Sequence, residues 1–270
     1  DYKKFLKMKK YIVIGNPIEH SLSPKLHNYW FKILNINAVY EKRKIKLDEI
    51  GDLISDIKNR KISGINVTVP FKKDVISHLD NLSTEAKETE SVNTIFLKDN
   101  MVIGHNTDIE GFELSIRYFN LDLKNKKVLI LGAGGVVPSI IYALQKLKVS
   151  KIIISNRTKD KAENLKKKFK NLEVVDWGSN INFDIIINAT SIGLNKNDEI
   201  GLDFSKITKK FFYDVIYNPA ETNFLKSGKL FGNKIYNGKM MFIYQALSAF
   251  KIWHKVEPKI DSKVVKLLDT

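Results

Sequence analysis

Cysteine is absent from the 270 residues of the chain. This absence excludes a disulfide framework and any metal site built on thiolates, and nothing in the composition indicates an oxidising compartment. Long apolar runs are also missing, since none approaches the roughly 18–20 residues that span a bilayer. The N-terminal stretch DYKKFLKMKK is too basic for a signal peptide, and we interpret it as a leader before the first strand. We therefore expect a cytoplasmic protein without a membrane partner.

Arginine is scarce, although the formal net charge is +15. It occurs only at positions 43, 60, 117 and 157, and lysine supplies the other positive charges along the whole chain. Arginine is the usual residue for bidentate reading of bases and phosphates, so its scarcity argues against a nucleic-acid partner. A nucleic-acid-binding module is the alternative from another functional class, and it predicts retention on polyanions with a steep salt dependence.

Histidine is sparse as well, with five residues in the chain. His20 and His27 have no second histidine or carboxylate at metal-ligand spacing, so we expect no metal site. We interpret both as structural hydrogen-bonding residues.

The strand and helix patterns divide the chain at about residue 109. Before it, apolar strands alternate with helices and end in a hairpin, for which Lys98-Asp99-Asn100 is the turn signal. One of these helices is expected from about residue 71. After residue 109, strands alternate with amphipathic helices, which indicates a parallel doubly wound sheet. A last long helix is expected from about Gly238, and the predicted class is α/β with two domains.

A glycine-rich turn, LILGAGG (residues 129–135), follows a strand of the second part and precedes a helix. Glycine lets the backbone approach a pyrophosphate, and a helix N-terminus favours negative charge. The pattern is imperfect, because Val137 stands where G-x-G-x-x-G requires its third glycine. A plain tight turn between strand and helix is therefore the alternative.

The end of the next strand indicates which dinucleotide is bound. About 20 residues after the glycines, an NAD site presents an acidic residue to the ribose. Here the strand ends in Ser155-Asn156-Arg157-Thr158 with Lys161 nearby, and no carboxylate is present. Arg157 suits a 2′-phosphate, so the sequence predicts NADP. The alternative is a helix-capping threonine beside ordinary surface charges.

Polar segments outside this unit, together with the dinucleotide motifs, resemble the shikimate dehydrogenase family over nearly the whole chain and in the same order. The segments are GNPIEHSLSPKLHN (15–28), GINVTVPFK (64–72), SVNTI (91–95), GHNTDIEG (104–111), GAGG (132–135), NRT (156–158), NATSIGL (188–194), DVIYNP (214–219) and NGKMMFIYQA (237–246). The sequence departs from the family pattern at Glu90-Ser91, where the family usually has Gly-Ala. It departs again at Val136-Val137-Pro138, where small residues are usual.

The resemblance implies NADPH-dependent, reversible reduction of 3-dehydroshikimate to shikimate in aromatic amino acid biosynthesis. It implies a substrate domain (1–108 plus the C-terminal helix 238–270) and a Rossmann-type NADP domain (109–237) around a cleft. The last helix would thus return to the substrate domain, and we expect a monomer or a homodimer. A quinate/shikimate dehydrogenase with relaxed substrate and cofactor use is the alternative within the fold.

Site residues follow from the matched motifs. Lys72 and Asp108 resemble the catalytic pair. The residues that resemble substrate-binding positions are Ser21, Ser23, Asn66, Thr68, Asn93, Tyr217 and Gln245. Those that resemble cofactor-binding positions are Gly132, Ala133, Gly134, Gly135, Asn156, Arg157, Thr158, Lys161, Thr190, Gly238 and Met240. Each polar residue also has a structural interpretation, such as a helix cap at Ser23 or Asp108 or a pinned strand end at Asn93.

Overall fold

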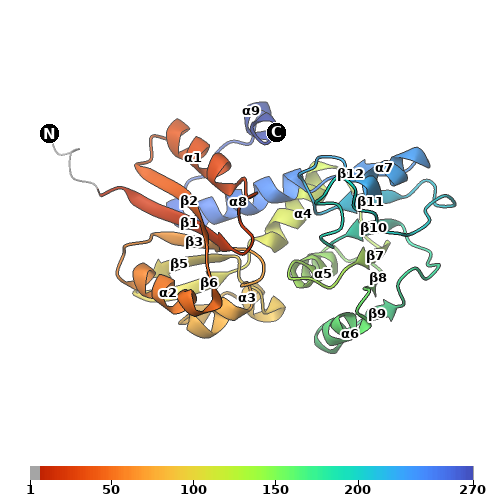
Figure 1. Cartoon of the computed structure of the whole chain (residues 1–270), viewed down its shortest axis with the longest axis horizontal. Helices are drawn as coiled ribbons and strands as arrows, with labels where there is room; N and C mark the ends of the chain where they lie inside the picture. The colour runs from red at the N-terminus through yellow and green to blue at the C-terminus, as the bar shows by residue number, and fades with distance from the viewer. Residues whose placement is uncertain (1–6, 270) are drawn as a thin grey trace. The chain divides into compact units, whose positions relative to one another are not determined.

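The computed structural model describes residues 7–269, so residues 1–6 of the predicted leader and residue 270 lie outside the described part. The chain forms two compact units (Figure 1). Unit 1 contains the residues up to Gly111 and Ile243–Asp269, and unit 2 contains Phe112–Phe242. The predicted α/β class with two domains is confirmed, and the C-terminal part of the last long helix returns to unit 1 as expected.

Unit 1 is built on a mixed sheet with the strand order β2-β1-β3-β5-β6-β4. The strands are β1 (Lys9–Gly15), β2 (Ala38–Lys44), β3 (Gly64–Val67), β4 (Asn81–Leu82), β5 (Thr94–Lys98) and β6 (Met101–His105). The predicted hairpin joins the antiparallel β5 and β6. Asp99 and Asn100 have positive φ angles of 50° and 59°, as a tight hairpin turn requires.

Alternation along β1 divides the apolar side chains of unit 1 between two faces of the sheet. Ile12 and Ile14 pack in one core with the buried face of α2 (Ile50–Lys58). Tyr11 points to the other face, where it contacts Phe31 of α1 (Ser23–Ile33) and Trp253 of α8 (Lys239–His254). Figure 1 accordingly shows α1 and α2 on opposite sides of this sheet.

Two expectations for unit 1 are wrong. The helix expected from about residue 71 is only a 3₁₀ helix, η3 (Asp74–His78). The carbonyl of Lys72 accepts a hydrogen bond from the backbone N–H of Val92 at 2.9 Å, which draws this segment toward the sheet.

The second concerns His27, which is not a hydrogen-bonding residue. Its buried ring stacks on Tyr40, and neither ring nitrogen has a partner among the described residues. Burial lowers the pKa of His27 to about 3, so the ring is neutral.

The remaining helical segments of unit 1 are short. They are η2 (Leu47–Glu49), α3 (Thr84–Thr89) and α9 (Ser262–Leu267). Glu90 ends α3 in the left-handed conformation with a φ of 47°. This is the position at which the family usually has glycine, a residue that adopts this conformation without strain.

Unit 2 is the doubly wound half, with a parallel sheet in the order β12-β11-β10-β7-β8-β9. The strands are β7 (Lys127–Leu131), β8 (Lys151–Ser155), β9 (Leu172–Val175), β10 (Ile185–Asn188), β11 (Phe211–Asp214) and β12 (Lys234–Tyr236). Numbered within the unit, this is the order 6-5-4-1-2-3 of dinucleotide-binding sheets, whose order reverses between β7 and β10. Ligands of such sheets bind at this switch point, beyond the carboxyl ends of the strands.

Helices cover both faces of this sheet. They are α4 (Asp108–Tyr118), α5 (Val137–Lys146), α6 (Lys159–Lys168) and α7 (Asn223–Leu230). Adjacent residues of β11 point in opposite directions: Phe212 packs against Phe224 of α7, and Tyr213 packs against Phe112 of α4. In the described part of the chain, no helix is long and apolar enough to cross a membrane.

Candidate active site

Lys72 and Asp108 form an ion pair within unit 1. The Nζ atom of Lys72 lies 2.6 Å from Oδ2 of Asp108, and the two side chains are 12% and 10% exposed. Lys72 lies in the segment between β3 and η3, and Asp108 is the first residue of α4, where the helix dipole favours a carboxylate. A short ion pair with so little solvent access has a fixed geometry, unlike a surface pair between mobile side chains.

Asn93 holds the other oxygen of the Asp108 carboxylate. Its Nδ2 atom donates to Oδ1 of Asp108 at 3.0 Å, and its Oδ1 atom accepts from the backbone N–H of Thr107 at 2.7 Å. Both oxygens of Asp108 are therefore engaged, one by an ammonium and one by an amide. The expected pair and one expected substrate residue are thus brought together by direct contacts.

Asn66 joins the same network from β3. Its Nδ2 atom donates to the backbone oxygen of Asn93 and to Oγ1 of Thr94, both at 3.0 Å. Its Oδ1 atom accepts from the hydroxyl of Tyr40 at 2.7 Å. Thr68, two residues after Asn66, is half-buried beside Gly15. A Cβ atom on Gly15 would lie 2.5 Å from Cγ2 of Thr68, so glycine permits this close approach.

The two predicted serines lie at the start of α1. Ser23 is buried in the first turn, and its backbone N–H donates to Oγ of Ser21 at 3.4 Å. Ser23 is also a polar neighbour of the Tyr40 side chain, which in turn donates to Asn66. Gln245 is half-buried on the part of α8 that belongs to unit 1.

In unit 2, the glycine turn after β7 fits a pyrophosphate. Gly132 has a φ of +112°, and a Cβ atom there would lie 2.9 Å from the backbone oxygen of Ala189. A Cβ atom on Gly135 would meet nothing within 4 Å, so the backbone on that side is open to a ligand. Ala133 and Gly134 lie between these two glycines, ahead of the N-terminus of α5.

Arg157 lies at the carboxyl end of the neighbouring strand β8, beside a hollow of about 400 Å³. The hollow is lined by Arg157, Ser191, Ile192, Leu194, Asn195, Asp198 and Glu199. Asn156 donates from Nδ2 to the backbone oxygen of Thr158 at 2.7 Å, which shapes the turn before α6. Lys161 is exposed in the first turn of that helix. A guanidinium beside an open hollow fits the 2′-phosphate of NADP.

A buried network fixes the loops after β10 and β11. Thr190 donates from Oγ1 to Oδ1 of Asn188 at 2.7 Å, and Asn188 donates from Nδ2 to Oδ1 of Asp214 at 3.1 Å. Asp214 also accepts from the hydroxyl of Thr222 at 2.6 Å. Burial raises the pKa of Asp214 to about 6. The sequence motifs contain Asn188 and Asp214, but only the fold brings them together.

The segment before α8 crosses the loop after β11. A Cβ atom on Gly238 would lie 2.1 Å from the backbone oxygen of Val215, so only glycine fits. Met240 is buried, and the ring of Tyr217 stacks on that of Phe242 with a centroid distance of 4.4 Å. The predicted cofactor neighbours Gly238 and Met240 thus belong to unit 2, where Gly238 lies against the loop after β11.

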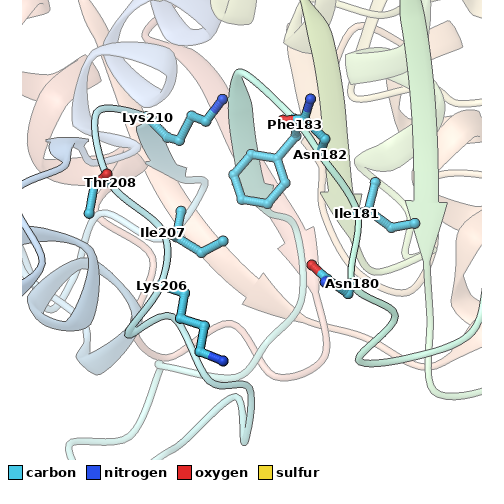
Figure 2. Close-up of a pocket in the computed structure, with 8 residues that line it drawn as sticks. All are labelled: Asn180, Ile181, Asn182, Phe183, Lys206, Ile207, Thr208 and Lys210. Atoms are coloured by element: carbon cyan, nitrogen blue, oxygen red, sulfur yellow. The ribbon is translucent and has the colours of Figure 1, made fainter.

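A second hollow, of about 330 Å³, lies at the amino-terminal ends of the strands of the unit 2 sheet (Figure 2). It lies between the loops that precede β10 and β11, and Figure 2 shows Phe183 and Ile207 facing it from these two loops. It contains none of the predicted site residues. Because parallel sheets bind ligands at the carboxyl ends of their strands, this hollow is not the nucleotide site.

Comparison with known proteins shows which family the chain resembles. A family model described as the shikimate dehydrogenase substrate binding domain matches residues 13–95, and one described as shikimate / quinate 5-dehydrogenase matches residues 113–197. A shikimate dehydrogenase (NADP(+)) of Pelagibacter ubique is 60% identical over 262 residues, which cover 97% of this chain and 99% of the relative. The chain belongs to the shikimate dehydrogenase family.

Solved shikimate dehydrogenases have the same fold. One that was crystallised with NADP+ matches with a TM-score of 0.90 and 36% identity, covering 97% of this chain and 95% of the other. The enzyme of Aquifex aeolicus matches with a TM-score of 0.88 and 38% identity, covering 96% of each chain. The family resemblance seen in the sequence motifs is confirmed, whereas the roles of individual residues stay predictions.

Three buried residues of the hydrogen-bond network around Asn66, Asn93 and Asp108 were not predicted as site residues. Thr94 and Thr107 lie within the motifs SVNTI and GHNTDIEG without a predicted role, and Tyr40 lies outside every matched segment. A polar group on the buried face of a strand was the available signal for Tyr40. Sequence alone does not identify its partner, because that partner lies 26 residues away on another strand.

Proposed function

We propose that this chain catalyses the reversible, NADPH-dependent reduction of 3-dehydroshikimate to shikimate on the route to the aromatic amino acids. The observation that carries the proposal is the ion pair between Lys72 and Asp108, because it combines a proton donor with a group that fixes it. The family match and the naming of relatives as NADP(+) enzymes support the same reaction and cofactor.

Reduction of a ketone requires a hydride at carbon and a proton at oxygen, and NADPH supplies the hydride when bound. The ammonium of Lys72 would donate a hydrogen bond to the ketone oxygen and stabilise the negative charge that develops there. The proton then moves from Nζ to that oxygen, which completes the alcohol. Asp108 holds the ammonium at 2.6 Å, so the donor is already oriented before the substrate binds. Oxidation of shikimate reverses these steps.

The polar groups around this pair suit a small, polyhydroxylated anion. Ser21 and Ser23 would bind the carboxylate, and Asn66, Thr68 and Asn93 would contact hydroxyl groups. Tyr217 and Gln245 would complete the substrate contacts. A site that hydrogen-bonds hydroxyl groups rejects analogues that lack them, because its own buried polar groups are then left unpaired.

The cofactor residues follow from the fit of unit 2 to a dinucleotide. The turn Gly132–Gly135 would hold the pyrophosphate through its open backbone. Arg157, with Asn156, Thr158 and Lys161, would bind the adenosine 2′-phosphate. Thr190, Gly238 and Met240 would lie at the nicotinamide end.

The direct test is the absorbance of reduced nicotinamide after the purified protein is mixed with shikimate and NADP⁺. We expect a steady rise, and a much slower one with quinate and NAD⁺. No rise from folded protein would overturn the proposed function. A quinate rate with NAD⁺ that equals the shikimate rate with NADP⁺ would favour the quinate/shikimate alternative instead. We also propose a cytoplasmic monomer or homodimer, which light scattering after size exclusion would distinguish.

A further inference from the structure

Two buried hydroxyl groups in the hydrogen-bond network that leads to Asp108 have no role in the proposed reaction. Tyr40 on β2 is 1% exposed and Thr94 on β5 is 0% exposed. Both lie on strands of unit 1, and each contacts Asn66, which is on the strand β3. Thr94 lies directly opposite Asn66 in the antiparallel register of β3 and β5.

The chemistry of the partners fixes how the Asn66 amide is oriented. The backbone oxygen of Asn93 can only accept, so the atom that faces it must be Nδ2 of Asn66. Oδ1 of Asn66 therefore faces Tyr40, whose hydroxyl must be the donor. Ser23 is a second polar neighbour of the Tyr40 hydroxyl. Burial raises the pKa of Tyr40 well above its usual value, which keeps this hydroxyl protonated.

Thr94 continues the chain of hydrogen bonds in the same direction. Its Oγ1 atom accepts from Nδ2 of Asn66 at 3.0 Å and donates to Oδ1 of Asn93 at 3.1 Å. The backbone N–H of Thr107 requires that this atom of Asn93 is the oxygen. Nδ2 of Asn93 therefore faces Asp108, to which it donates at 3.0 Å. Donors and acceptors thus run in one direction from Tyr40 to Asp108.

We propose that Tyr40 and Thr94 are positioning residues, whose hydroxyl groups complete a one-directional chain of hydrogen bonds through Asn66 and Asn93 to the carboxylate of Asp108. This inference rests on the proposed function, because the expected changes in kcat require the proposed reaction. Neither hydroxyl would touch the substrate. Their effect would reach Lys72 through the orientation of Asp108.

The amides of Asn66 and Asn93 each have only one orientation that suits their backbone partners. Rotating the Asn93 amide by 180° would place Nδ2 against the backbone N–H of Thr107 and Oδ1 against the Asp108 carboxylate. Rotating the Asn66 amide would place Oδ1 against the backbone oxygen of Asn93. Each hydrogen bond in a buried network of this kind strengthens the next, and an unmade one is costly. Loss of one hydroxyl should therefore loosen Asn93 and Asp108, although the backbone N–H of Thr107 still holds Asn93 in place.

The kinetic test compares Thr94→Val, Thr94→Ser and Tyr40→Phe with the wild type in the oxidation of shikimate. We expect Thr94→Val to lower kcat by about 3- to 30-fold and Tyr40→Phe to have a smaller effect in the same direction. The KM for NADP⁺ should not change. Thr94→Ser restores the hydroxyl and should return kcat to within about twofold of the wild type. Tyr11→Phe is the matched control, because Tyr11 is a buried tyrosine on β1 of the same sheet and takes no part in this series of hydrogen bonds.

The double variant of Tyr40→Phe and Thr94→Val tests whether the two hydroxyl groups act through the same series of hydrogen bonds. Their effects on kcat should be less than additive, whereas Tyr11→Phe with Thr94→Val should be additive. The proposal is overturned if folded Thr94→Val keeps wild-type kcat, if Thr94→Ser does not restore it, or if Tyr11→Phe causes an equal loss.

A crystal structure of Thr94→Val separates this inference from the proposed function. We expect the Asn93 amide to adopt a second orientation or to lose its contact with Asp108. An unchanged Asn93–Asp108 contact would overturn the positioning role, whatever the activity. Absence of turnover in the wild type would overturn the proposed function alone, and the crystal structure would still decide the positioning role.

Discussion

Replacement of Lys72 by alanine is the sharpest test of the candidate site. The variant loses the group that would protonate the ketone oxygen, and loss of a general acid lowers turnover by about 10²–10⁴-fold. The KM for shikimate should change little, because the residues expected to bind the carboxylate and hydroxyl groups remain. Steady-state rates of NADP⁺ reduction with saturating shikimate measure this directly.

The same change has a structural cost that follows from burial. Without Lys72, Oδ2 of Asp108 lacks its cation, and at 10% exposure water hardly replaces it. Leaving such a group unpaired costs about 1–3 kcal/mol. For a chain of this size we expect the melting temperature to fall by about 2–12 °C. The measurement must therefore confirm that the variant is folded at the assay temperature.

Lys73 provides a matched control. It is the next residue, its side chain is 78% exposed, and its Nζ atom lies 3.5 Å from Oε2 of Glu90 at the surface. Lys73→Ala removes the same charge but should leave both turnover and melting temperature nearly unchanged. Near-normal turnover of folded Lys72→Ala would refute the reasoning, as would an equal loss in Lys73→Ala.

Three further predictions concern the cofactor, the pH dependence and the backbone. Arg157→Ala should weaken NADP⁺ binding by about 10- to 100-fold and leave NAD⁺ binding nearly unchanged, as measured by titration calorimetry; equal losses for both would exclude a 2′-phosphate contact. Burial raises the pKa of Asp214 from 3.8 to about 6, so folding favours its protonated form. Its contribution to the free energy of unfolding should fall by about 2 kcal/mol between pH 4 and pH 6.5, and urea unfolding of Asp214→Asn should lack this slope. Glu90→Gly should raise the free energy of unfolding by about 0.5–1 kcal/mol, because φ is 47° there; a loss of stability would contradict the strain argument.

Local patterns predicted much of the fold. The hairpin of β5 and β6 followed from Asp99 and Asn100, which readily adopt a positive φ. The turn after β7 followed from its glycine-rich motif, in which Gly132 has a φ of +112° and no room for a Cβ atom. The parallel sheet of unit 2 followed from the alternation of strands and helices.

The predictions failed for elements whose sequence has only a weak periodic pattern. The helix α7 and the three-residue edge strand β12 were not predicted, because one is short and the other is half-exposed. The segment after Phe71 was expected to be an α-helix, yet the Lys72 carbonyl bonds to Val92 on a distant segment. Tertiary hydrogen bonds therefore overrode the local preference at the residue that carries the proposed chemistry.

The sequence by itself determined which elements form and in what order, because strand alternation, helix periodicity and turn conformation depend on neighbours along the chain. It also supplied the motifs that indicated the family. Only the tertiary structure decided which polar groups meet. The register of β3 with β5 places Asn66 opposite Thr94, and the start of α4 places Asp108 beside Lys72 and Asn93. A hydrogen bond depends on a few tenths of an ångström between atoms far apart in the chain, and no local pattern fixes that distance.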